Sequence, residues 1–364
     1  MTMYTAAVIG SGMIANEGHI PACLAMNERV NLRAVCGRNP DTVAQTAKRY
    51  GIPGSYTDVE EMLEKVKPDI VSVCTPNQTH AQYVSMALKA GCHVLCEKPV
   101  GLNSTEVKAL YALAEKQNRL LIACQTLRFQ PEWTQARRLV QSGELGEIIA
   151  AGFDRIRSRG IPTWGGFHRK AVSGGGAMAD IGVHLLDGLL WMLGNPKVIS
   201  VTGFASDQLT KANPDLCCPT ESSGAGTAQV SNAGYQGEQF DVEEYAAGIA
   251  RLETGVPISF QAAWAANLPE QTHIRILGTK ASLLVPEMQM HDGTRSWLLS
   301  ERRPAPRYGG AFSGHKYLLE HVLDVLDGNA RLLITPEESI NVSTALELFY
   351  RSSEQLREVS LSEL

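Results

Sequence analysis

The strongest constraint on the fold is an alternation of short apolar runs and helix-forming segments over the first 124 residues. Apolar runs that predict strands lie at 6–9, 32–36, 70–74, 93–96 and 120–124. Segments that predict helices lie between them at 42–50, 59–64, 80–90 and 104–117. Strands joined by crossover helices form a parallel sheet with right-handed connections. This part of the chain is therefore predicted to be an α/β domain built on a parallel sheet.

A glycine-rich turn follows the first predicted strand and precedes a helix-compatible segment. It has the G-x-G-x-x-A pattern of dinucleotide-binding turns, with the residues Gly10, Ser11, Gly12, Met13, Ile14 and Ala15. In this pattern the first glycine permits the tight turn, and the second lets the backbone approach the pyrophosphate. The alanine allows close packing of helix and strand, and the N–H groups at the helix start bind phosphates. The turn predicts a dinucleotide cofactor.

The end of the second predicted strand bears on which cofactor is used. Enzymes that prefer NAD usually place Asp or Glu there, about 20 residues after the glycines, to hold the ribose hydroxyls. This chain has Gly37, Arg38 and Asn39 at that place. An arginine suits a 2′-phosphate, so we expect NADP in preference to NAD. The alternative is that Arg38 stacks on the adenine, which would serve either cofactor.

Polar residues follow two later strands of the predicted sheet. One group is Thr75, Pro76, Asn77 and His80, and the other is Glu97, Lys98 and Pro99. Ligands of parallel sheets bind at the carboxyl ends of the strands, so both groups are expected at the cofactor crevice. Lys98, biased toward an extended conformation by Pro99, could donate to a substrate hydroxyl.

An acid and an imidazole stand four residues apart after a run of three glycines at 174–176. On a helix, Asp180, His184 and Asp187 would share one face, and the helix dipole would favour Asp180 in the first turn. Such a pair can transfer protons. Taken alone, it is as often a structural pair as a catalytic one.

These motifs together resemble the glucose-fructose oxidoreductase and inositol dehydrogenase family, written Gfo/Idh/MocA. The glycine turn, Thr75-Pro76-Asn77, Glu97-Lys98-Pro99 and the Asp180 to Asp187 stretch occur in the family's order, and the resemblance covers essentially the whole chain. It implies an N-terminal Rossmann domain, here 1–124, and a C-terminal α/β domain with a large open, mostly antiparallel sheet, here 125–364. It also implies Lys98, Asp180 and His184 as the catalytic residues.

The chemistry of these residue types agrees with that implication. Oxidation of a secondary alcohol by a nicotinamide removes a hydride from carbon and a proton from oxygen. His184 could accept the proton, Asp180 could orient its ring, and Lys98 could hydrogen-bond the reacting oxygen. We therefore expect an NAD(P)-dependent oxidoreductase acting on a sugar, polyol, cyclitol or sugar derivative. The alternatives are a redox-neutral enzyme that uses tightly held NAD for elimination or glycoside cleavage, and a non-catalytic cofactor-binding regulator.

The second half of the chain should supply the substrate pocket. Strands are expected at 148–157, 198–205, 246–253, 257–265, 273–277, 282–285 and 296–300, with closing helices at 315–327 and 336–356. The segment 159–170 precedes the glycines and should form a wall of the site. Trp164 could stack on a sugar ring, and His168 or Lys170 could contact hydroxyls. Each of these residues is as often a packing residue or a surface residue without a role in binding.

Two further features of this half concern its surface. The stretch 207–241 is rich in Gly, Ser, Thr, Asn and Gln, which predicts an insertion loop. Strand residues that could form an exposed apolar face are Ile258, Phe260, Ala262, Trp264 and the alternation at 274–277. Large exposed apolar patches mark interfaces, so a homodimer or a homotetramer is expected.

Composition excludes several classes of protein. A net charge of −5 without a long basic run does not indicate nucleic-acid binding. No apolar stretch reaches roughly 18 residues, and no leader pattern is present. We therefore expect no membrane association and a cytoplasmic location. None of the eight cysteines forms a C-x-x-C pair or joins histidines at zinc-finger spacing. We expect reduced, mostly buried thiols and no metal site.

Overall fold

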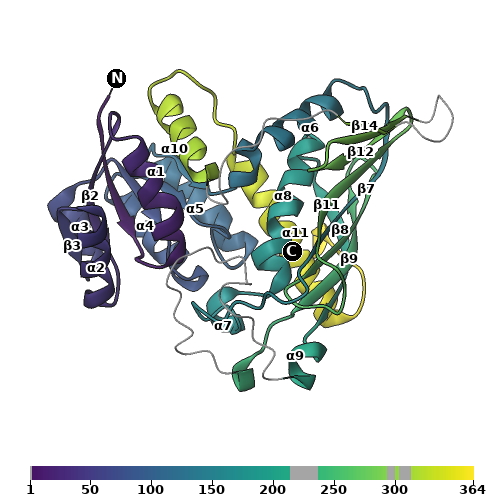
Figure 1. Cartoon of the computed structure of the whole chain (residues 1–364), viewed down its shortest axis with the longest axis horizontal. Coiled ribbons are helices and arrows are strands. Elements are labelled where there is room, and N and C mark those ends of the chain that lie inside the picture. Colours follow the sequence, from purple (N-terminus) through teal and green to yellow (C-terminus); the bar gives the residue numbers. More distant parts are fainter. Residues whose placement is uncertain (1, 214–236, 293–299, 303–312) are drawn as a thin grey trace. The chain divides into compact units, whose positions relative to one another are not determined.

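The structure, a computed structural model, describes residues 2–213, 237–292, 300–302 and 313–364 (Figure 1). By its internal contacts the chain divides into two compact units. The first contains the residues up to Thr126 and the described residues from 313 to Ser339. The second contains the other described residues. The expected assignment of all of 125–364 to one domain therefore differs from the structure in the segment that ends at Ser339.

The first unit is built on a six-stranded sheet with the order β3-β2-β1-β4-β5-β6, and every pair of neighbours is parallel. Its strands are β1 (Tyr4–Ile9), β2 (Val30–Cys36), β3 (Gly54–Tyr56), β4 (Ile70–Val73), β5 (His93–Cys96) and β6 (Leu121–Ala123). The predicted Rossmann sheet is confirmed. The short strand β3 has no apolar run and was not predicted. The strand order reverses between β1 and β4, where such sheets bind their ligands.

Helices connect these strands. They are the π-helix η1 (Ala15–His19), α1 (Ile20–Ala25), α2 (Pro40–Tyr50), α3 (Val59–Val66), the 3-10 turn η2 (Asn77–Thr79), α4 (His80–Lys89) and α5 (Ser104–Lys116). The helix α10 (Ser313–Leu326) returns to this unit and packs on α1. Arg29 pairs with Asp324 at 2.8 Å and with Asp327 at 3.0 Å, and the Tyr4 hydroxyl donates to Asp327. These contacts explain why α10 departs from the predicted division.

The second unit is built on a nine-stranded sheet with the order β14-β13-β12-β11-β7-β10-β9-β8-β15. Its strands are β7 (Ile148–Ile156), β8 (Val198–Ser206), β9 (Tyr245–Leu252), β10 (Pro257–Ala263), β11 (Gln271–Gly278), β12 (Ala281–Val285), β13 (Gln289–Asp292), β14 (Ser300–Arg302) and β15 (Val359–Ser360). Only β7 and β10 pair in parallel, so the mostly antiparallel sheet is confirmed. Of the strand predicted at 296–300, only Ser300 lies within the described residues.

Helices of the second unit pack on one face of this sheet (Figure 1). They include α6 (Pro131–Gln141), α8 (Val183–Met192) and the part of α11 (Pro336–Gln355) from residue 340 onward. Shorter elements are η3 (Thr126–Phe129), α7 (Lys170–Ser173), the π-helix η4 (Met178–Gly182), α9 (Gln208–Ala212), η6 (Gly237–Gln239) and η7 (Leu361–Glu363). The predicted loop at 207–241 thus begins with α9 and contains η6, and its residues 214–236 lie outside the described part.

The predicted exposed apolar face is wrong. Ile258, Phe260, Ala262, Trp264, Ile274 and Ile276 are buried, and Phe260 lies between Phe153 of β7 and Phe349 of α11. Period-two alternation identifies an apolar face but does not tell whether helices cover it. Other apolar residues of the sheet strands are exposed instead, and among these the largest exposed fractions are those of Ile149 (56%), Phe204 (55%) and Ile249 (54%).

Two features of the whole described chain bear on earlier expectations. No helix among the described residues is both long and apolar enough to cross a membrane. Six described cysteines are free and buried, as expected, and they are Cys23, Cys36, Cys74, Cys92, Cys96 and Cys124. Cys217 and Cys218 lie outside the described residues.

A buried ion pair anchors α8 in the second unit. Arg128 of η3 donates from Nε to Asp187 Oδ2 at 2.8 Å and from Nη2 to Asp187 Oδ1 at 2.6 Å. Both side chains are only 1% exposed. The guanidinium of Arg128 and that of Arg137 of α6 also lie over the Trp191 ring. The pair therefore joins η3 to α8 away from water, and Arg137 adds a contact from α6.

We expect Asp187→Ala to lower the free energy of unfolding of the second unit by about 3–5 kcal/mol, because it leaves the Arg128 charge buried without its partner. The matched control is Glu354→Ala, which breaks the exposed Lys170–Glu354 pair and should cost less than about 1 kcal/mol. Denaturant titration followed by tryptophan fluorescence measures this, since all five tryptophans lie after Thr126. Equal effects of the two substitutions would contradict the anchoring role.

Candidate active site

The glycine turn of the first unit has the geometry that a dinucleotide requires. Gly10 has a φ of +115°, and a Cβ there would lie 2.4 Å from the Cys74 carbonyl oxygen, so only glycine fits. Gly12 is exposed, and no described heavy atom would lie within 4 Å of a Cβ there, which leaves its backbone open to a ligand. Ala15 is completely buried, whereas Met13 and Ile14 are partly exposed. These residues fit a bound pyrophosphate.

Asn16, the next residue along the chain, braces this turn. Its amide donates to the carbonyl oxygens of Ser11 at 2.9 Å and Gly12 at 2.8 Å. Its own carbonyl oxygen accepts from the Tyr50 hydroxyl at 2.7 Å. The sequence analysis did not select Asn16, because a single asparagine in a helix start carries no motif signal.

The end of β2 lies beside the same turn. A Cβ on Gly37 would lie 3.0 Å from Ser11 Oγ, and Ser11 Oγ is 3.2 Å from Thr42 Oγ1. Arg38 is exposed. Asn39 caps α2, because its side chain accepts from the N–H groups of Asp41 and Thr42. Arg38 and the hydroxyls of Ser11 and Thr42 therefore lie near the end of β2, where a cofactor ribose is expected, and the Asn39 amide oxygen is used within the protein.

The loops after β4 and β5 are joined by His80. Its Nδ1 lies 2.7 Å from the Pro99 carbonyl oxygen, and its Nε2 lies 2.7 Å from the Thr75 carbonyl oxygen. His80 is fully buried and Asn77 is buried, whereas Thr75, Pro76 and Lys98 are partly exposed. The predicted cofactor residue His80 therefore links the backbones of two loops, and Lys98 keeps access to solvent.

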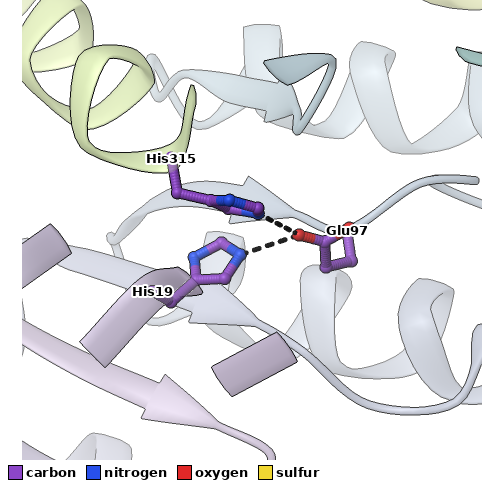
Figure 2. A group of neighbouring side chains, drawn as sticks. All are labelled: His19, Glu97 and His315. Atoms are coloured by element: carbon purple, nitrogen blue, oxygen red, sulfur yellow. Dashed lines mark hydrogen bonds and ion pairs between the residues drawn. The ribbon is translucent and has the colours of Figure 1, made fainter. Parts of the chain in front are cut away.

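Glu97 is buried between two histidines (Figure 2). Its Oε1 lies 2.9 Å from His19 Nε2 and 2.9 Å from His315 Nε2, and its Oε2 accepts the Lys98 N–H at 3.3 Å. Burial opposes ionisation of the carboxyl, but the hydrogen bonds from both histidines outweigh it and hold the pKa of Glu97 well below its usual range. The carboxylate predicted to face the cofactor thus contacts His19 and His315.

Asp180 and His184 stand out in the second unit because of their exposure. From residue 175 to residue 192, which includes η4 and α8, every residue is buried except these two, which are partly exposed. Asp180 lies in the π-helical turn that leads directly into α8, and π-turns are frequent at functional sites. Asp187 does not join them at the surface, since it is buried in its pair with Arg128. The acid and the imidazole are the polar groups that this buried helix presents.

Two residues around Asp180 were not predicted for the site. The indole N–H of the buried Trp264 donates to Asp180 Oδ2 at 2.9 Å. Burial lowers the pKa of Arg155 in β7 to about 10, Arg157 adds to this, and the negative charge of Asp180 acts in the opposite direction. Arg155 is thus a cation near Asp180. Its signal in the sequence is a basic residue in phase with the apolar strand positions Ala151 and Phe153. Both of these residues are buried.

A buried carboxylate holds the glycine run that leads into η4. Glu243 accepts from the N–H groups of Gly176 at 2.9 Å and Met178 at 3.0 Å, and from the Tyr350 hydroxyl at 2.9 Å. A Cβ on Gly176 would lie 1.9 Å from the Glu243 carbonyl oxygen, so the glycine allows this close approach. Two hydrogen bonds to Glu243 therefore fix the backbone just before Asp180.

The remaining predicted substrate residues differ in their surroundings. Trp164 is partly exposed. His168 is buried, which lowers its pKa, and its carbonyl oxygen accepts the Asp241 N–H at 3.1 Å. Lys170 pairs with Glu354 on the surface at 2.6 Å. Of the three, Trp164 keeps the side-chain access that a sugar ring would need.

Comparison with known proteins gives two domain matches and full-length relatives. Residues 4–124 match the oxidoreductase family with an NAD-binding Rossmann fold, and residues 133–284 match the Gfo/Idh/MocA C-terminal domain. The chain is 28% identical over 361 residues to D-glucoside 3-dehydrogenase of Escherichia coli K12, which covers 98% of this chain and 97% of that protein.

Two further matches are also to oxidoreductases. A putative UDP-kanosamine synthase oxidoreductase subunit of Amycolatopsis mediterranei is 33% identical over 265 residues, covering 72% of this chain and 69% of that protein. The solved structure of levoglucosan dehydrogenase in complex with NADH and levoglucosan has the same fold, with a TM-score of 0.82, 18% identity, and coverage of 99% of this chain and 100% of that one. The chain therefore belongs to the Gfo/Idh/MocA family of oxidoreductases, whose N-terminal domain is an NAD-binding Rossmann fold.

Proposed function

We propose that the protein is an NAD(P)-dependent dehydrogenase or reductase that acts on a secondary alcohol or ketone of a sugar or sugar derivative. The observation that carries this proposal is the exposure pattern at residues 175–192, where only Asp180 and His184 reach solvent. The names of relatives point to the same substrate class, since they include D-glucoside 3-dehydrogenase and levoglucosan dehydrogenase. The fit of the glycine turn to a pyrophosphate supports the cofactor.

We assign a separate role to each catalytic residue. The nicotinamide, when bound, supplies the hydride acceptor or donor. His184 takes the proton of the substrate hydroxyl in oxidation and returns it in reduction. Asp180, held by the Trp264 indole, stabilises the imidazolium form of His184. Lys98 donates a hydrogen bond to the reacting oxygen, and Arg155 is a further candidate for contact with substrate hydroxyls.

The cofactor is proposed to be NADP in preference to NAD. Arg38, Ser11 and Thr42 offer one guanidinium and two hydroxyls at the end of β2, which suits a 2′-phosphate. No carboxylate occupies residues 37–39, where an NAD-preferring enzyme usually places one. NAD remains the alternative, with Arg38 stacked on the adenine.

We further propose a homo-oligomer that forms through the uncovered face of the nine-stranded sheet. Phe204 of β8 and Ile249 of β9 are exposed on adjacent paired strands, where Thr202 pairs with Ile249 and Phe204 with Ala247. Exposed apolar patches of this kind mark interfaces. The free, buried cysteines support a reducing compartment, and we propose the cytoplasm.

Substitution of the catalytic residues should remove turnover and keep the cofactor. We expect His184→Ala and Lys98→Ala each to lower kcat by roughly a hundredfold or more, because each removes a positioned proton-transfer or donor group. The assay follows nicotinamide absorbance with a panel of glucosides, anhydrosugars, inositols and keto-sugars, and cofactor affinity is measured by fluorescence. His291→Ala, which removes an exposed histidine on β13, is the control and should retain full activity.

Full activity in His184→Ala would overturn the catalytic assignment. Tight cofactor binding by the unaltered protein, without turnover of any compound in the panel, would contradict the proposed dehydrogenase activity. It would instead favour a redox-neutral enzyme or a regulator.

Arg38→Ala tests the cofactor preference. We expect it to weaken NADP binding by roughly 10-fold to 100-fold, which corresponds to the loss of a charge-assisted hydrogen bond, and to change NAD binding far less. Arg33→Ala, at an exposed position on β2, removes the same charge away from the strand end and should change neither affinity. Equal losses for both cofactors would support adenine stacking over phosphate recognition.

The oligomer is tested with two acidic substitutions on the sheet face. We expect the unaltered protein to be a dimer or tetramer by light scattering, and Phe204→Asp combined with Ile249→Asp to shift it toward the monomer. Leu356→Asp, at an exposed apolar residue after α11, is the control and should leave the mass unchanged. A monomeric unaltered protein would refute the proposed interface.

A further inference from the structure

The cluster of His19, Glu97 and His315 brings together three distant parts of the first unit (Figure 2). His19 is the last residue of η1, which follows the glycine turn. Glu97 follows β5 and precedes Lys98, and His315 lies in the first turn of α10. All three side chains are buried. None of these three residues has a role in the proposed hydride transfer, so the meeting of two histidines and a glutamate needs another explanation.

The cluster brings three potential metal-ligand atoms close enough together to hold one ion. The two imidazole nitrogens each lie 2.9 Å from Glu97 Oε1, and the three candidate ligand atoms lie within 4.8 Å of one another. Among the described residues, no other group of three or more His, Cys, Asp or Glu side chains comes this close. A tetrahedral zinc ion with bonds of about 2.0–2.2 Å spaces its ligands by roughly 3.3 Å. Each of the two nitrogen–oxygen distances would lengthen by about 0.4 Å to reach this spacing.

The charge of the cluster also suits a cation. A buried carboxylate is costly unless a positive charge accompanies it. The partners of Glu97 in this cluster are imidazoles, so an added proton or a metal ion must supply that charge.

We propose that His19 Nε2, Glu97 Oε1 and His315 Nε2 bind a divalent transition-metal ion, with zinc as the best fit. Two imidazole nitrogens and one carboxylate oxygen suit zinc, whereas calcium and magnesium take oxygen ligands. A fourth position is left for a water molecule or for Glu97 Oε2. The ion would tie η1, the segment before Lys98 and α10 together, and its role would be structural.

Calorimetric titration of tag-free, full-length, chelator-treated protein with zinc chloride tests the proposal. We expect saturable binding of one ion per chain. His19→Ala and Glu97→Gln should each lower the affinity by at least roughly a hundredfold, since each removes one ligand. The matched control is His291→Ala, which removes an exposed histidine elsewhere and should bind zinc as the unaltered protein does.

A second measurement needs no variant and so does not depend on how the substituted chains fold. In crystals of the unaltered protein soaked in zinc, anomalous scattering on either side of the zinc absorption edge should place the ion between the three side chains. An ion found elsewhere, or no zinc binding in solution, would overturn the proposal. It would leave a hydrogen-bonded triad that carries an added proton. Unchanged affinity in both ligand variants would overturn it equally.

Discussion

Burial of α8 is the constraint on which the candidate chemistry of the second unit depends. The Arg128–Asp187 pair anchors the helix from within, and Glu243 holds the backbone that enters it. A buried ion pair requires good geometry on both partners, so the helix has little freedom to rotate. As a result, Asp180 and His184 are presented by a fixed apolar helix. Preorganisation of this kind is what proton transfer to a substrate requires.

The first unit uses the same principle with different groups. His80 contacts the backbones of the loops after β4 and β5, and Glu97 joins the second of these loops to His19 and His315. Buried polar networks of this kind are costly when incomplete and rigid when satisfied. They position the segment that carries Lys98. In both units a π-helical turn adjoins the residues of interest, η1 at His19 and η4 at Asp180.

Three residues were not assigned to the candidate site from the sequence. Trp264 was expected on an exposed apolar face, yet it is buried and donates to Asp180. Trp264 continues the alternation of its strand neighbours, and alternation does not distinguish a covered face from an open one. Arg155 had a signal, as a basic residue in phase with buried positions. Asn16 had none, because its role depends on backbone carbonyls that only the folded turn brings near.

Local patterns along the chain predicted the parallel sheet of the first unit and most strands of the second, and they drew attention to the glycine turn and the Asp180–His184 pair. Those features depend on local periodicity and short spacing, which are properties of neighbouring residues. The folded chain was needed to show that helices cover the Ile258 and Phe260 face, that α10 returns to the first unit, and that residues 19, 97 and 315 meet. Contacts between residues far apart in the chain leave no local pattern, because they arise from how whole elements pack.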